Sequence, residues 1–171
     1  CPIHEKPCEH LSEESYFFKL SKYQDLLLKY IYDHPDFIQP SIRKNEILGF
    51  LENEKLQDIS ISRKTFDWGI PVPNDSSHVM YVWFDALTNY ISSLGGVETD
   101  DFNNYWKNTI HFIGKDILRF HAVYWPAMLL ALDLPLPKKI LVHNWIMMKD
   151  GKMSKSKGNV VYPEKLISRY G

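Results

Sequence analysis

The order of apolar segments between residues 58 and 148 is the feature that most constrains the fold of this chain. Three apolar, β-rich runs, HVMYV, TIHFIG and KKILVHN, are separated by two apolar segments with helical spacing. Strands that alternate with helices in this way are typical of a parallel sheet. We therefore expect an α/β fold with helices on both faces of the sheet, because apolar strands of this kind are buried on each side.

The neighbouring segments are predicted from their cap and turn residues. We expect two helices before the sheet, one capped by Ser21 and ended before Pro35, the other capped by Ser41. LQDISIS alternates like a strand, whereas WGIPVPNDSSH has the composition of a loop. The long apolar helix ILRFHAVYWPAMLLALDL should be kinked at Pro126, and Asp150-Gly151 suits a tight turn.

Composition excludes several classes of protein. Twenty Lys and Arg residues oppose 21 Asp and Glu, which argues against a protein that coats nucleic acid by bulk electrostatics. No apolar run approaches the roughly 20 residues of a membrane span, so no membrane partner is expected. Cys1 and Cys8 lie too close together for a disulfide framework of the secreted kind. These features favour a soluble protein of a reducing compartment, with any anion site confined to a local patch.

Polar residues follow the predicted strands in WFDA, GKD and KDGKMSKSKG, where ligands of parallel sheets collect. Gly114 would let the backbone approach a ligand, and Asp116 could accept from an ammonium group or simply cap its own helix. Ile117, His121 and Trp125 recur every fourth residue and share one helix face. That stripe is either ordinary core or, as we expect from its start at a strand end, the lining of a cavity.

The segment MMKDGKMSKSKGNVVYP, residues 147–163, concentrates positive charge in a chain that is nearly neutral. Four lysines stand against a single aspartate, and Gly and Ser provide a mobile backbone. A solvated charge run would have the same composition. However, the segment follows a buried strand, and a mobile lysine loop can bring ammonium groups to a polyphosphate. We expect an irregular loop with that function.

KMSKS, Lys152 to Ser156, resembles the second signature of the class I aminoacyl-tRNA synthetases. Together with WGIPVP, YVWFDALTNYI and HFIGKDILRFHAVYWPAMLL, it resembles the methionyl-tRNA synthetase family over most of residues 13–171. DALTNYI and GKDILRFHA are most similar to the compact bacterial and mitochondrial branch. The resemblance implies a location in the bacterial cytoplasm or the mitochondrial matrix.

The resemblance also implies a division of the chain. Residues 1–57 would be the end of a connective insertion and a helical linker. Residues 58–148 would be the second half of a Rossmann-like parallel sheet with flanking helices, and residues 149–171 the KMSKS loop and the start of the next domain. The His-Ile-Gly-His signature of the family does not occur in the 171 residues. We therefore expect a fragment that does not aminoacylate by itself.

The implied reaction is ATP-dependent activation of methionine, with Mg²⁺ accompanying ATP, followed by transfer to tRNA(Met). Lys152 and Lys155 correspond to the catalytic lysines. The residues that match methionine-binding positions are Trp83, Ala86, Tyr90, Asp116, Ile117, His121 and Trp125. Those that match ATP-binding positions are Gly114, Lys115, Lys152, Met153, Ser154, Lys155 and Ser156.

Two further questions concern metal and specificity. Many family members carry a Cys-rich zinc knuckle, but Cys1, His4, Cys8 and His10 are spaced more closely than most structural zinc ligands, so zinc is not expected. Ligases for isoleucine, leucine and valine share KMSKS, although the predicted aromatic wall disfavours branched aliphatic substrates. A synthetase-derived module that binds RNA or protein without catalysis is the alternative from another class.

Overall fold

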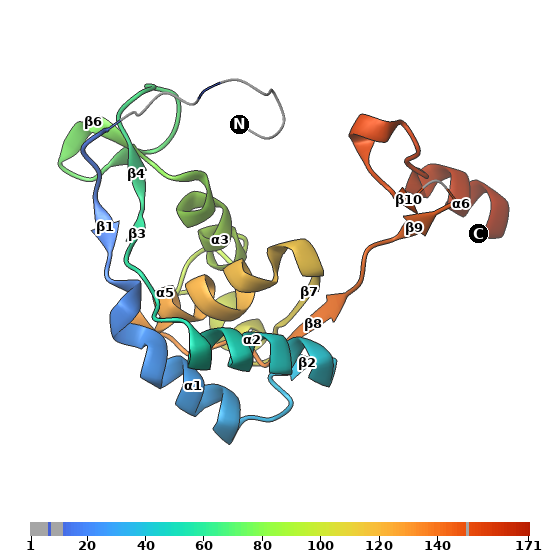
Figure 1. The fold of residues 1–171 in the computed structure, drawn as a ribbon, viewed down its shortest axis with the longest axis horizontal. Helices are drawn as coiled ribbons and strands as arrows, with labels where there is room; N and C mark the ends of the chain where they lie inside the picture. Colours follow the sequence, from blue (N-terminus) through green and yellow to red (C-terminus); the bar gives the residue numbers. More distant parts are fainter. Residues whose placement is uncertain (1–6, 8–11, 150) are drawn as a thin grey trace.

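The computed structural model describes residues 7, 12–149 and 151–171, and a short parallel sheet lies at its centre (Figure 1). The order of strands is β2 (Ile38–Gln39), β8 (Lys139–His143), β7 (Ile110–Gly114). The register places Gly114 opposite His143, so the carboxyl ends of β7 and β8 lie side by side. The α/β prediction is confirmed, with TIHFIG and KKILVHN as neighbouring parallel strands.

HVMYV contributes residues 78–80 to a strand, as predicted, but its predicted place in the parallel sheet is wrong. The strand is β6 (Asp75–Met80), which pairs antiparallel with β4 (Ser62–Arg63) and β5 (Pro71–Val72) in a separate sheet. Part of the WGIPVPNDSSH segment is therefore strand and not loop. Asn74 has a φ of 66°, which permits the tight turn that folds β5 back onto β6. A turn this short can join only antiparallel strands.

The first helices share a core with the parallel sheet. A 3-10 turn, η1 (Leu20–Tyr23), leads into α1 (Gln24–Asp33), and α2 (Ser41–Asn53) packs beside it. Ser21 does not cap α1, because its hydroxyl donates to Asp58, and Ser41 is itself the first residue of α2. Two short strands, β1 (Phe17–Phe18) and β3 (Ile59–Ser60), pair antiparallel. The shared core includes Leu27, Ile31, Ile47, Leu51, Ile113, Ile140 and Val142.

The long apolar helix is divided into three parts. They are the 3-10 turn η3 (Lys115–Ile117), the π-helical turn η4 (Phe120–Tyr124) and α5 (Trp125–Ala131). Pro126 occupies the first turn of α5, directly after the π-helical turn, so the regular helix is interrupted next to the proline and the kink expected there stays a prediction. A second core joins α5 to α3 (Val82–Ser92), α4 (Asp100–Tyr105) and η2 (Trp106–Asn108).

Described residues cover only one face of the parallel sheet, contrary to the prediction of helices on both faces. On the other face Ile110 and Phe112 are 53% and 68% exposed, and Leu141 is 38% exposed. Alternation along each strand explains this division, since His111, Ile113, Ile140 and Val142 point to the covered side. The sheet thus presents an apolar surface that no described helix packs against.

After β8 the chain leaves the body of the molecule as an arm of residues 144–171 (Figure 1). The arm contains β9 (Met147–Met148), β10 (Gly151–Lys152), the 3-10 turn η5 (Lys155–Lys157) and α6 (Pro163–Tyr170). The predicted irregular loop is therefore partly a β-hairpin, while Asp150 of the expected turn lies outside the described residues. Within the described ranges, no helix has the length and apolar character that crossing a membrane requires.

Candidate active site

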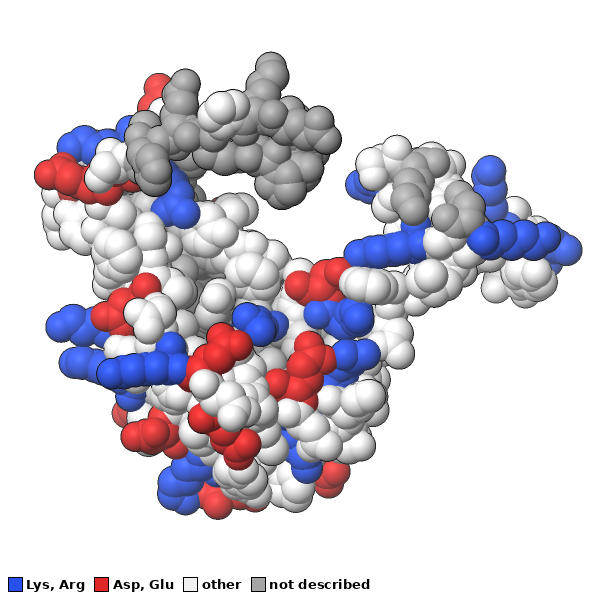
Figure 2. Space-filling model, in the orientation of Figure 1, with Lys and Arg blue, Asp and Glu red and all other residues white. Residues whose placement is uncertain are grey.

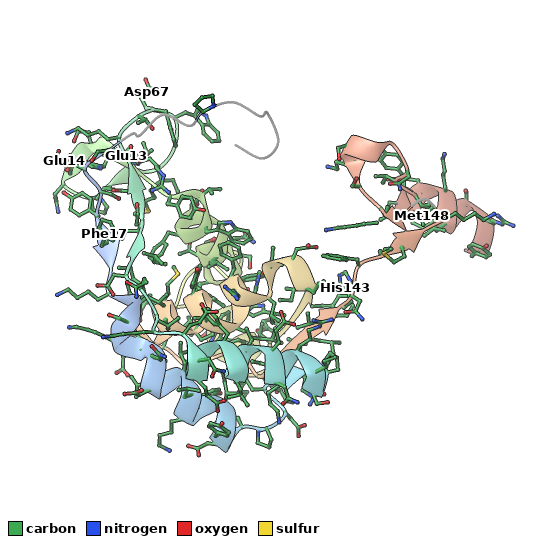
Figure 3. The ribbon with its side chains drawn as sticks, viewed as in Figure 1. Glu13, Glu14, Phe17, Asp67, His143 and Met148 are labelled. Carbon is green, nitrogen blue, oxygen red and sulfur yellow. The ribbon has the colours of Figure 1, made fainter. Side chains whose placement is uncertain are left out.

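The carboxyl end of β7 brings together side chains from four parts of the chain. β7 ends at Gly114, and the turn η3 carries Lys115 and Asp116 directly beyond it. Figure 3 shows His143 at the neighbouring end of β8, where the arm begins, and Met148 farther out on the arm. Two clusters of side chains meet at this turn, one from α3 and η4 and the other from the arm.

The first group, called here the aromatic cluster, consists of Trp83, Tyr90, His111, Phe120, His121 and Trp125. The Trp83 ring stacks on Phe120, with centroids 3.7 Å apart. The Tyr90 hydroxyl lies 2.8 Å from His121 Nε2, and the Tyr90 and Trp125 rings are 6.1 Å apart. The fold therefore brings together four of the predicted methionine-binding residues from two separate segments.

Of the remaining three residues of that predicted set, Ala86 and Ile117 lie on the same segments as the aromatic cluster, and Asp116 belongs to the second cluster. Ala86 lies between Trp83 and Tyr90 on α3 and is exposed. Ile117 is half-buried in η3, and its carbonyl oxygen is 2.9 Å from His121 Nδ1. That bond links the aromatic cluster directly to the turn that carries Asp116.

The helix-face residues of the aromatic cluster are buried in this structure. His121 is 2% exposed and Trp125 is fully buried, whereas Trp83, Tyr90 and Phe120 are half-buried. The cavity expected beside them from the sequence stays a prediction. Burial lowers the pKa of the His121 imidazole, and burial together with nearby His121 lowers that of His111 to about 4. Both histidines are neutral at neutral pH.

One surface hollow, of about 420 Å³, lies beside the antiparallel sheet and is lined by residues that include Lys64, Phe66 and Ser77. Lys64 is already paired with Glu14 at 2.9 Å, and Figure 3 shows Glu14 and Asp67 on the opposite side of the molecule from the arm. This hollow holds none of the groups predicted to do chemistry, so it is not the candidate site.

The second cluster surrounds the Asp116 carboxylate. Its Oδ1 accepts from the Trp145 indole N–H at 2.6 Å and from the Lys152 ammonium at 2.9 Å. The Lys115 ammonium lies 3.8 Å from the centre of the Trp145 ring. Two hydrogen bonds lower the pKa of Asp116, and the one from Lys152 has a larger effect than the one from Trp145. The carboxylate is therefore ionised and receives cationic and N–H donors from the arm.

These contacts bear on the two roles that the sequence allowed for Asp116. The turn η3 begins at Gly114 without a side-chain cap, and the two hydrogen bonds that reach the Asp116 carboxylate come from the arm. Asp116 therefore acts in this structure as an acceptor for an ammonium group. Capping of its own helix is not observed.

The lysine segment has local order of its own. The Ser154 backbone N–H donates to Asn159 at 2.8 Å, and the hydroxyls of Ser154 and Ser156 are 3.2 Å apart. Met153 joins the hairpin through its backbone N–H, which donates to Ile146. Lys155 is exposed, and Figure 2 shows Lys and Arg side chains along an arm that stands apart from the body. Among the described side chains of the predicted loop, Lys152 is the one that hydrogen-bonds to Asp116.

Gly114 is not required by the fold. Its φ of −76° suits any residue, and an added Cβ would lie 3.5 Å from His143, an ordinary contact. The glycine therefore leaves space in front of the strand end without relieving strain. Such a position suits the close approach of a ligand to the backbone.

Sequence reasoning missed three residues of these clusters: His111, Phe120 and Trp145. Strand alternation places His111 on the same face as Ile113 and could have identified it as an inward-facing polar group. Trp145 follows β8 by two residues and carried no pattern. The four predicted metal candidates at positions 1, 4, 8 and 10 lie outside the described residues, and within the described part of the chain no group of three or more His, Cys, Asp or Glu could hold a metal.

The family model described as "tRNA synthetases class I (M)" matches residues 1–171. The methionine–tRNA ligase of Enterococcus faecalis is 59% identical over 165 residues, which are 95% of this chain and 25% of that protein. The ligase of Oceanobacillus iheyensis is 57% identical over 167 residues, 96% of this chain and 25% of that protein. The chain thus spans about a quarter of the length of these curated relatives.

A solved structure agrees with the sequence comparisons. The crystal structure of Mycobacterium tuberculosis methionyl-tRNA synthetase bound by methionyl-adenylate matches with a TM-score of 0.85 at 48% identity. The match covers 93% of this chain and 31% of the other. The parallel sheet, the antiparallel sheet and their helices therefore have a known counterpart.

Proposed function

The chain belongs to the methionyl family of class I tRNA synthetases, and we propose that it is part of an enzyme that activates methionine with ATP and transfers it to tRNA(Met). In the first step the methionine carboxylate would attack the α-phosphorus of ATP, giving methionyl-adenylate and pyrophosphate. In the second, a terminal ribose hydroxyl of the tRNA would take the methionyl group and release AMP. Translation is the process served.

One observation carries this proposal: the turn η3 contacts both clusters. Asp116 is bound by Lys152 of the KMSKS segment, while the neighbouring carbonyl of Ile117 is bound by His121 of the aromatic cluster. An apolar amino acid held among the aromatic rings would thus have its ammonium group close to Asp116. The lysines of the arm would then lie near the carboxylate of the bound methionine, which is the group that reacts with ATP.

We assign methionine binding to the side chains named for it in the sequence analysis. Asp116 would receive the substrate α-ammonium, which would replace the Lys152 ammonium now bound to it. The thioether would lie against aromatic rings, contacts that favour sulfur. Because His121 and Trp125 are buried and neutral, they offer an uncharged wall to an uncharged side chain.

We assign the nucleotide to the strand end and the arm. Gly114 would face the adenosine, and Lys115 and residues 152–156 would contact the phosphates. Lys152 and Lys155 would stabilise the charge that develops on the leaving pyrophosphate, since phosphoryl transfer needs chiefly positioning and charge stabilisation. Mg²⁺ would arrive with ATP and neutralise phosphate charge. Asp116, the carboxylate of this turn, is paired with Lys152, and among the described residues no group of three or more His, Cys, Asp or Glu could hold a metal.

We also propose that residues 58–148 complete a nucleotide-binding domain with a part of the longer protein that packs on the exposed sheet face. The apolar surface of Ile110, Phe112 and Leu141 supports this, as does the length of the relatives. From the sequence we expect residues 1–57 to belong to the connective insertion and a helical linker, and residues 149–171 to the KMSKS loop and the following domain. Because β2 pairs with β8, and α1 and α2 share the core of the parallel sheet, we propose that the linker segment from α1 to α2 is built into the nucleotide-binding domain. The bacterial relatives favour the cytoplasm over the mitochondrial matrix.

ATP–pyrophosphate exchange by the full-length enzyme tests the proposal. Exchange that depends on methionine, and is weak with isoleucine, leucine and valine, is expected. Preference for a branched amino acid would favour the other class I ligases. Absence of exchange with every amino acid, in a folded protein that still binds tRNA, would favour a non-catalytic module.

A further inference from the structure

His111 lies at the centre of the aromatic cluster although the sequence assigned it no role. It points inward from β7 and is 3% exposed. Its Nε2 is 3.1 Å from the Trp125 indole nitrogen, and its ring is 4.1 Å from the Tyr90 ring. One imidazole therefore contacts two residues proposed to form the methionine wall.

The hydrogen bonds define which nitrogen of each histidine carries the proton. An indole N–H can only donate, so His111 Nε2 must accept, and its proton is on Nδ1. The Ile117 carbonyl can only accept, so His121 carries its proton on Nδ1 and its Nε2 accepts from Tyr90. The Tyr90 hydroxyl and the Trp125 indole are thus each held by a neutral imidazole.

The hydrogen-bond partners of Trp106 and Trp125 differ, although both side chains are buried. The Trp106 ring lies edge-on to His111 and Trp125, but its indole N–H donates to the Pro135 backbone carbonyl and not to a side chain of the cluster. The Trp125 indole instead bonds to a side chain whose other face contacts Tyr90. Rotation of the Trp125 ring would break its bond to His111 and leave a buried N–H without a partner, which is costly.

We propose that His111 is a positioning residue that fixes Trp125 and Tyr90 and thereby sets the shape of the pocket for the substrate side chain. The inference rests on the proposed function and extends it to specificity. His111 acts through the two rings and does not touch the substrate. It should therefore affect recognition of the amino acid side chain and leave the use of ATP unchanged.

Steady-state pyrophosphate exchange by the full-length enzyme is the test. His111→Leu removes the acceptor while keeping an apolar side chain, and should raise KM for methionine about tenfold, the effect of one lost hydrogen bond. KM for ATP and kcat should stay within about threefold, a difference of less than 1 kcal/mol. His111→Gln retains an acceptor near the position of Nε2 and should restore most of the affinity for methionine.

Trp106→Phe is the matched control, since it removes an indole N–H bond to a backbone carbonyl while keeping an aromatic ring beside His111 and Trp125. It should lower thermal stability without changing the ratio of the two KM values. An unchanged KM for methionine in His111→Leu, or an equal rise in both KM values, would overturn the inference. Loss of methionine-dependent exchange in the unmodified enzyme would instead overturn the proposed function.

A double-mutant cycle with Trp125→Phe gives a second measurement. Once the indole donor is absent, His111→Leu should raise KM for methionine much less than it does beside Trp125. Independent, multiplicative effects of the two changes would contradict the inference. If His111→Leu does not fold, His111→Phe, which keeps an aromatic ring but offers no acceptor to Trp125, takes its place in the cycle.

Discussion

The Lys152 ammonium lies 2.9 Å from the Asp116 carboxylate, although the two residues are 36 positions apart. The same carboxylate oxygen accepts from Trp145, so the arm is tied to the end of β7 by two bonds. If Asp116 receives the substrate ammonium, Lys152 competes with methionine for it. Methionine binding would then release the lysine toward the phosphates.

Replacement of Lys152 by Met tests this competition. We expect methionine to bind the Lys152→Met enzyme about two- to fivefold more tightly, since exposed ion pairs contribute roughly 0.2–1 kcal/mol. Adenylate formation should nevertheless be slower, because a charge near the phosphates is lost. Equilibrium dialysis with methionine alone, followed by single-turnover kinetics, measures both effects. Weaker methionine binding in this variant would contradict the competition.

Asp116→Asn should have the opposite effect on binding. The amide oxygen can still accept from Trp145, but it offers no charge to an ammonium group. We expect methionine affinity to fall at least about tenfold, while the free energy of unfolding changes by less than about 1 kcal/mol, as is usual for exposed pairs. A large loss of stability with normal methionine affinity would show that Asp116 is structural.

Lys155 should act on the rate and not on amino acid binding. It is exposed on the arm, and a lysine that contacts phosphate only in the transition state lowers the barrier without affecting methionine. In Lys155→Ala we expect adenylate formation to slow by about 100-fold or more, with methionine affinity unchanged. Lys165→Ala, on α6 of the same arm, is the control for lost charge. An unaltered single-turnover rate would remove Lys155 from the mechanism.

The parts of the fold that the sequence predicted are those with a regular pattern. Helix α3 and strands β7 and β8 have apolar residues at helical or alternating spacing. Strand β2 has only two residues, too few for a period, and its partner Ile140 is 102 residues from Ile38. The hairpin of β5 and β6 depends on the positive φ of Asn74. The composition of this segment, rich in Gly, Pro, Asn and Asp, predicted a loop instead.

In the candidate site too, the residues with regular spacing were predicted from the sequence, whereas contacts between separate segments were not. Spacing every four residues placed Ile117, His121 and Trp125 on one face, and they do converge with Tyr90. The bond between His111 and Trp125 depends on how β7 packs against the π-helical turn, which no local pattern encodes. Likewise, contact between Asp116 and Trp145 depends on the direction in which the arm leaves β8.

Gly114→Ala separates a ligand role from a folding role. The backbone φ of −76° and the 3.5 Å contact with His143 allow a methyl group, so thermal stability should be unchanged or slightly higher. If ATP approaches this backbone closely, the methyl group should raise KM for ATP several-fold. Gly49→Ala in α2, where a Cβ meets nothing within 4 Å, is the control and should affect neither KM. Equal KM values for ATP in both variants would exclude a close approach at Gly114.

The last prediction concerns pH and the buried imidazole of His111. Burial and the neighbouring His121 lower its pKa to about 4, whereas an unfolded chain has the ordinary value of 6.5. Tyr90 from α3, Trp106 from η2, and His121 and Trp125 from the η4–α5 segment face the ring, and none of them carries a negative charge at neutral pH.

Between pH 6.5 and 4 the unfolded chain therefore binds a proton that the folded chain excludes. The stability that neutral His111 contributes is fully present above pH 6.5 and is lost as the pH falls through this window. From pH 7 to pH 5 the His111 contribution should fall by about 2 kcal/mol, since one pKa unit corresponds to about 1.4 kcal/mol. His111→Gln cannot titrate, so it should lose less stability over the same range than the unmodified protein. Urea unfolding of both proteins at pH 7 and pH 5 measures the difference. Parallel losses in the two proteins would mean that other groups, His121 among them, account for the pH dependence.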